Sequence, residues 1–137
     1  MIKQTLIASA ILLGLAACQN TDSISLETPA LEGTWYVEVA LDMPVIDYSP
    51  AQLIFAADGS LTGNNSCNNF FGQYQQNGEA LTLAPAGSTR KACVDALMDQ
   101  EQRVMQAMPQ VKRAQMTKGK LNLLDDKGKT VLVLSKM

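Results

Sequence analysis

The segment from Gly63 to Gly72 constrains the fold most, because it combines one cysteine with four asparagines, two glycines and two adjacent phenylalanines. Glycine and asparagine tolerate positive φ, and asparagine side chains bond to the backbone around turns. If the chain is extended after such a turn, Phe70 and Phe71 point to opposite faces of a sheet. The pattern predicts a kinked crossing between two strands. We expect Cys67 to hold this crossing in place and core aromatics to flank it.

The first eighteen residues form a separate unit. A positive start with Lys3 precedes an apolar run from Leu6 to Leu15, and small residues and Cys18 close the run. The run is too short to span a membrane and is typical of a secretory signal, and small residues before a cysteine match a bacterial lipobox. We therefore predict a lipoprotein signal peptide over residues 1–17 and lipidation of Cys18. The alternative is a plain signal peptide in which Cys18 is incidental.

The predicted lipid anchor assigns the protein to the cell envelope. Several acyl chains on one residue give stable anchoring, and Gln19 is not the aspartate that resembles an inner-membrane retention signal in enteric bacteria. In a host with two membranes we therefore expect the outer membrane, with the domain facing the periplasm. Residues 18–29 are polar and predict a flexible tether, which leaves residues 30–137 for one folded domain.

The number of cysteines predicts one disulfide. If Cys18 carries lipid, Cys67 and Cys93 remain, which is an even number in an exported and oxidising compartment. A redox-active pair is the alternative, but such pairs usually have close spacing such as Cys-x-x-Cys. We therefore expect a structural bridge between the asparagine-rich crossing and the segment that precedes the predicted helix.

Short alternating apolar segments separated by turn signals predict about eight strands, and Asn77-Gly78 is the strongest hairpin signal. One helix is predicted between the fifth and sixth strands, with Asp95 as its cap and Pro109 at its end. Sequential hairpins favour a mostly β fold, an antiparallel sheet curled into a barrel-like shape with the helix covering an open side. The expected core consists of Trp35, Phe55, Phe70, Leu83, Leu97, Val104 and Leu123.

The apolar face of the predicted helix has two interpretations. Methionine fills irregular core gaps, and it also lines adaptable binding surfaces. In the second interpretation, Met98, Glu101, Met105 and Met108 line a groove that takes an acyl chain or a partner segment. Glu101 is unusual on this face. It is either a rim residue whose head reaches water or a buried partner of a donor such as Arg90.

The sequence offers little for catalysis or metal binding. It contains no histidine, which removes Ser-His-Asp and Cys-His nucleophilic arrangements and histidine-based zinc sites. Acidic pairs such as Asp125-Asp126 are interpreted as solvated hairpin ends, and no glycine-rich phosphate loop appears. We therefore predict no catalytic residue, no metal and no cofactor. The net charge of −2 argues against a nucleic-acid partner.

The residues also carry a resemblance to a known family. The family pattern appears as Leu31-x-Gly33-x-Trp35, Gly63-x-x-x-Cys67-Asn68-x-Phe70-x-Gly72, Thr89-x-x-x-Cys93, Glu101 and Leu121-x-Leu123. From about residue 31 to the C-terminus, the chain resembles the META/HslJ-like family of small bacterial envelope proteins, many of which are lipoproteins. One departure is Asn69, where the family often carries a basic residue.

The resemblance implies an antiparallel barrel-like fold, an association with heat shock or envelope stress, and a disulfide between Cys67 and Cys93. It supplies no family-wide catalytic residue or cofactor, and the members resemble in shape the pilot lipoproteins that chaperone secretins. We expect a membrane-anchored, non-enzymatic binding or scaffolding module, with an envelope protein or a lipid as its partner. The alternative is a carrier of lipid or another hydrophobic ligand, or a secretin-pilot-like chaperone.

Overall fold

The computed structural model describes residues 27–137, so the predicted signal peptide, Cys18 and most of the predicted tether lie outside the described residues. Within this part the chain forms nine strands, one α-helix and one 3₁₀ turn. The strands are β1 (Gly33–Ala40), β2 (Met43–Pro44), β3 (Ala51–Phe55), β4 (Ser60–Asn64), β5 (Asn69–Asn77), β6 (Ala80–Ser88), β7 (Arg113–Thr117), β8 (Lys120–Leu124) and β9 (Thr130–Lys136). The helix α1 (Asp95–Ala107) and the 3₁₀ turn η1 (Met108–Gln110) lie between β6 and β7.

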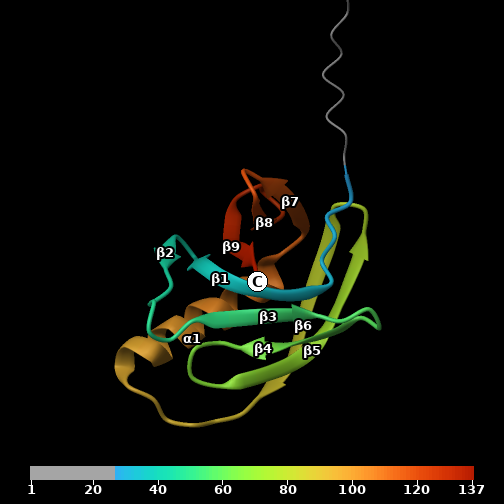
Figure 1. The fold of residues 1–137 in the computed structure, drawn as a ribbon. Coiled ribbons are helices and arrows are strands. Elements are labelled where there is room, and N and C mark those ends of the chain that lie inside the picture. The colour runs from blue at the N-terminus through green and yellow to red at the C-terminus, as the bar shows by residue number, and fades with distance from the viewer. Residues whose placement is uncertain (1–26) are drawn as a thin grey trace, which may run out of the picture.

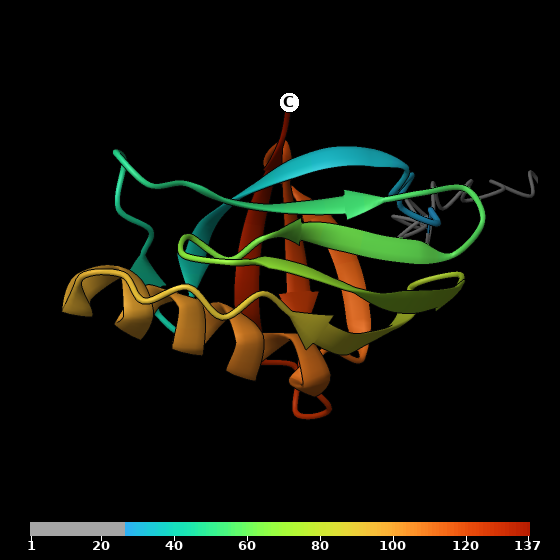
Figure 2. The ribbon, with the colours of Figure 1, turned by 90° about the horizontal axis from the view of Figure 1, so that it is seen from below.

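All paired strands are antiparallel, and the sheet curls into a ring (Figure 1). The strands pair in the order β2-β1-β3-β4-β5-β6-β7-β8-β9, and β1 also pairs with β9. The junction between β6 and β7 is short, with one residue pair, Ala80 with Arg113. Figure 2 shows α1 lying along one side of the sheet, and η1 contacts β6 next to this junction.

This architecture confirms the predicted mostly β fold with a single inserted helix. Nine strands are present instead of about eight, because the short segment Met43–Pro44 pairs with Val39 and Ala40 of β1 and adds a strand. The helix therefore lies between the sixth and seventh strands. The predicted Asn77-Gly78 turn joins β5 to β6, and Gly78 has a φ of 63°, which glycine adopts without strain.

The core fills the inside of the ring, and six of the seven residues expected there are buried: Trp35, Phe55, Phe70, Leu83, Val104 and Leu123. The prediction for Leu97 is wrong, because this side chain is only half-buried. Helix α1 buries Gln100 together with Val104 and Ala107. The buried amide is satisfied, since Gln100 Oε1 accepts a hydrogen bond from Ile46 N–H (2.7 Å) and Nε2 donates to Ser49 O (2.9 Å).

The ends of the helix differ from the prediction by one or two residues. Val94 occupies the position before the first helical residue and makes no capping hydrogen bond through its side chain. Asp95 is instead the first residue of the helix, where its carboxylate still interacts favourably with the positive end of the helix dipole. The helix ends at Ala107, and Pro109 lies in the 3₁₀ turn that follows.

Candidate functional site

The asparagine-rich crossing is the loop between β4 and β5, and it is tied to the segment that precedes α1. Cys67 and Cys93 form a disulfide, with their sulfurs 2.07 Å apart and their Cα atoms 6.0 Å apart. Ser66 adopts a φ of 99°, which is uncommon for a residue with a side chain. The loop compensates with local hydrogen bonds: Ser66 N–H donates to Asn64 Oδ1 (2.8 Å), and Asn68 N–H donates to Asn65 Oδ1 (2.7 Å).

Asn68 is the centre of this arrangement and is only 2% exposed. Its Oδ1 accepts hydrogen bonds from Thr89 Oγ1 (2.9 Å) and from Lys91 N–H (2.7 Å). Its Nδ2 donates to Lys91 O (3.2 Å) and to Glu101 Oε1 (3.0 Å). One side chain therefore joins the crossing to two other parts of the chain, the segment before α1 and the helix itself.

Glu101 is half-buried, and its carboxylate accepts hydrogen bonds from two asparagine amides. The donors are Asn65 Nδ2 (3.1 Å) and Asn68 Nδ2 (3.0 Å). Arg90 forms no ion pair with Glu101 within residues 27–137. The structure therefore agrees with the interpretation of Glu101 as a partner of a donor, with asparagine in place of arginine, and its carboxylate holds the crossing against the helix.

The four residues of the predicted helix-side groove do not come together on the surface. Met108 is fully buried, and Met105 is partly buried against the core. Met98 is 42% exposed, while the carboxylate of Glu101 accepts hydrogen bonds from the side chains of Asn65 and Asn68. Met105 and Met108 therefore fill the core.

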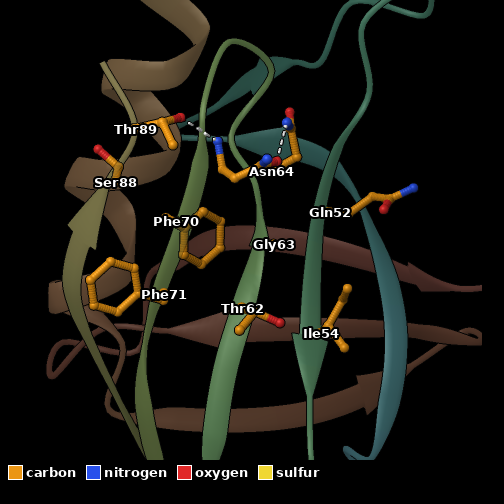
Figure 3. A pocket seen from close by; sticks show the side chains of 10 residues that line it. Gln52, Ile54, Thr62, Gly63, Asn64, Phe70, Phe71, Ser88 and Thr89 are labelled. Atoms are coloured by element: carbon orange, nitrogen blue, oxygen red, sulfur yellow. Dashed lines mark hydrogen bonds between the residues drawn. The ribbon is translucent and has the colours of Figure 1, made fainter. Parts of the chain in front are cut away.

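An open hollow of about 530 Å³ lies on the outer face of β3, β4, β5 and β6 (Figure 3). Its apolar floor is one row of residues that are direct neighbours across the strands. Ile54 of β3 lies opposite Thr62 of β4, and Thr62 lies opposite Phe71 of β5. Phe71 in turn lies opposite Gly87 of β6. We call this surface the outer-face hollow.

Phe71 is 59% exposed, whereas its neighbour Phe70 is 2% exposed. This confirms the prediction that the two rings point to opposite faces. Gly87 permits the position of the outer ring, because a Cβ atom at Gly87 would lie 2.7 Å from Phe71 Cζ. Figure 3 shows the Phe71 ring nearly face-on beside β6, and the exposed fraction of Phe71 places much of this side chain at the surface.

A second row across the same strands forms a polar rim. Gln52 lies opposite Asn64, and Asn64 lies opposite Asn69, with Asn64 Nδ2 donating to Asn69 Oδ1 (2.9 Å). Thr89 closes the row, since its N–H donates to Asn69 O (2.9 Å). The residues that line the hollow include no lysine, arginine, aspartate or glutamate.

Charged pairs within the described residues lie elsewhere. Lys120 of β8 pairs with Glu38 of β1, and this contact lowers the pKa of Glu38. Lys129 pairs with Asp42 at a distance of 3.0 Å between Nζ and Oδ2. Residues 27–137 contain no group of three or more Cys, Asp or Glu side chains placed to hold a metal ion. In the same part of the chain, no helix has the length and apolar character needed to cross a bilayer.

The outer-face hollow was not predicted from the sequence, because it depends on strand register. Ile54, Thr62 and Phe71 belong to three strands and become neighbours only when β3, β4 and β5 are paired in one register. A signal was nevertheless present. Ile54 and Phe71 are apolar residues at positions that alternate with core residues, so two outward-facing apolar side chains could be expected on adjacent hairpins.

Comparisons with known proteins agree with this fold. One similar solved structure is an NMR structure of a protein from Burkholderia xenovorans, with 20% identity over 99% of both chains and a TM-score of 0.63. Another is a crystal structure of a DUF4847 family protein from Bacteroides vulgatus, with 16% identity over 78% of this chain and 94% of that chain and a TM-score of 0.59. At this identity the similarity shows the fold alone. No curated protein matches the chain significantly. The family model of the META domain matches residues 28–137, so the chain belongs to the META domain family.

Proposed function

We propose that this protein is a membrane-anchored, non-enzymatic binding module of the bacterial envelope, held by lipid on Cys18. The outer-face hollow is its binding site. The observation that carries this proposal is the exposed Phe71 ring in a hollow without charged residues. Exposed apolar surface rimmed by polar groups is typical of interaction sites. The association with envelope stress, which the family resemblance implies, is part of the same proposal.

The chemistry of the lining favours binding over catalysis. The hollow offers amides, hydroxyls and apolar side chains, including Gln52, Asn64, Thr62 and Ser88. A hydroxyl becomes a nucleophile when an adjacent base removes its proton. The lining supplies no histidine, carboxylate or lysine for that role. Amides and hydroxyls are well suited to orient a ligand through hydrogen bonds.

The fold also supports binding because the crossing beside the hollow is held in place by a disulfide and by hydrogen bonds. Asn64 and Asn69 stand at the two ends of the crossing that the disulfide and Asn68 hold to the segment before α1. Sites on strands whose ends are fixed lose little conformational entropy when a ligand binds. The hollow is therefore preorganised before any ligand arrives.

Lipidation of Cys18 is tested by metabolic labelling. Cells that express the protein are grown with a palmitate analogue that can be detected after gel separation. We expect label on the wild-type protein and its loss in Cys18→Ser, because the thioether at Cys18 is the attachment point. A double variant Cys67→Ala, Cys93→Ala serves as the control and should keep the label. Label retained in Cys18→Ser would contradict the anchor.

The binding function is tested by photo-crosslinking in intact envelopes. A photoreactive residue is placed at Thr62, in the floor of the hollow, and in a second protein at Lys127, in the exposed β8–β9 turn. Intact-mass analysis after irradiation detects small ligands and proteins alike. We expect a defined adduct at Thr62 and none at Lys127. The same adducts at both positions, or none at Thr62, would contradict a binding site in the hollow.

A further inference from the structure

We propose that the ligand of the outer-face hollow is an uncharged saccharide whose ring stacks on Phe71. This inference rests on the proposed binding function and adds the chemical class of the ligand. Three observations support it: the exposed aromatic ring of Phe71, the polar rim beside it, and the absence of charged side chains from the lining of the hollow.

Phe71 supplies a stacking surface. Its ring lies beside Gly87 (Figure 3), and more than half of the residue is exposed to solvent. The face of an aromatic ring carries partial negative charge, and one face of a sugar ring presents C–H groups with small positive charge. The two surfaces attract each other and are both apolar. Thr62 and Ile54 continue the floor at the neighbouring positions of β4 and β3.

The rim supplies hydrogen-bonding groups two residues along the strands from the floor of the hollow. Asn69 and Phe71 lie two residues apart on β5, and Asn64 and Thr62 lie two residues apart on β4. Two residues of a strand span about 7 Å, so hydroxyl groups at the edge of a ring that stacks on Phe71 come near the rim. Within residues 27–137, Asn69 Nδ2 and the Thr62 hydroxyl have no hydrogen-bond partner among the side chains. Hydroxyl groups of a saccharide match these donors and acceptors.

The charge and shape of the hollow disfavour other ligands. A nucleotide or an anionic headgroup brings phosphate, which proteins usually bind with lysine or arginine, and neither residue lines the hollow. An acyl chain would cover the amides of Gln52, Asn64 and Asn69 without replacing their hydrogen bonds to water, and such desolvation is unfavourable. A neutral polyhydroxylated ligand satisfies both the apolar floor and the amide rim.

Saturation-transfer NMR on the lipidated protein in lipid nanodiscs tests the inference, with empty nanodiscs as the baseline. The probes are the neutral trisaccharides cellotriose, maltotriose and chitotriose, with adenosine and lysophosphatidylcholine for comparison. We expect saturation transfer to the C–H protons of at least one trisaccharide. Phe71→Leu keeps an apolar side chain but removes the aromatic face, and it should weaken binding by about tenfold.

Tyr48→Leu is the matched control, because Tyr48 is an exposed aromatic residue that does not line the hollow. It should bind the trisaccharide as the wild type does. Trisaccharide binding that Phe71→Leu leaves unchanged would overturn the inference, and so would transfer to adenosine or the lysolipid alone. If no trisaccharide binds but Thr62 still yields a defined adduct in envelopes, the saccharide is wrong and the binding function stands. If no probe binds and no adduct forms, both fail.

Discussion

The variant Asn68→Ala is expected to lower the free energy of unfolding by about 3 kcal/mol. The substitution removes four hydrogen bonds between the crossing and its neighbours. Lys91 N–H and Lys91 O lose their partner in hydrogen bonds that are partly buried, and Glu101 loses one of its two amide donors. Unsatisfied buried groups carry the full desolvation penalty, which is larger than the net value of the bonds themselves.

Denaturant unfolding followed by circular dichroism measures this effect, and Asn69→Ala is the matched control. Asn69 is the next residue in the chain but is exposed, and its side chain bonds with Asn64 on the surface. We expect this control to change the free energy of unfolding by about 0.5 kcal/mol or less. If both variants lowered the free energy of unfolding equally, the position of the amide inside the crossing would not matter for stability.

A second substitution at the same position separates shape from hydrogen bonding. Asn68→Asp keeps an acceptor for Thr89 and Lys91 N–H but cannot donate to Glu101 when it is ionised. It also places two carboxylates at the distance that now separates Asn68 Nδ2 from Glu101 Oε1, which is 3.0 Å. We therefore expect Asn68→Asp to be destabilised at neutral pH despite its nearly identical shape.

Local chemistry explains which parts of the fold could be predicted. The Asn77-Gly78 turn, the opposite directions of Phe70 and Phe71, and the break in periodicity at α1 are properties of a few adjacent residues. Such signals require no knowledge of distant contacts. The sequence therefore predicts the hairpins, the single helix and most of the core.

The strand β2 was missed because its turn breaks a sequence rule. Leu41 and Asp42, between β1 and β2, both have positive φ, at 48° and 67°. Tight turns with two such residues usually contain asparagine or glycine, and Leu-Asp does not carry that signal. The proline in β2 is also an unfavourable signal for a strand, although proline is tolerated at an edge.

The helix face and the site depend on contacts between distant segments. Gln100 is buried because the backbone of Ile46 and Ser49, more than fifty residues away, satisfies its amide. A helical pattern of apolar residues cannot reveal such a partner, so the pattern predicts Leu97 in the core in place of Gln100. The outer-face hollow has the same origin, since the pairing register of three strands creates it.

Loss of the Cys67–Cys93 disulfide is expected to lower the free energy of unfolding by about 3.5 kcal/mol at most. The two cysteines are separated by 26 residues, and an open loop of this length gives the unfolded chain more conformational freedom. The double variant Cys67→Ala, Cys93→Ala should melt roughly 10–20 °C below the wild type. An Ellman assay on the unreduced, denatured lipoprotein should find no free thiol. Two thiol equivalents per chain would contradict the bridge.

The disulfide and Asn68 act on the same contact, so their effects should not add. Asn68 Nδ2 lies 3.4 Å from Cys67 Sγ, and both residues fasten the crossing to the segment at residues 89–93. Once the bridge is absent, the crossing can move away from this segment, and water can satisfy the groups that Asn68 leaves. In the Cys67→Ala, Cys93→Ala background, Asn68→Ala should therefore lower the free energy of unfolding by less than it does in the wild type, with a coupling of about 1 kcal/mol. Strictly additive losses would mean that Asn68 holds its position without help from the bridge.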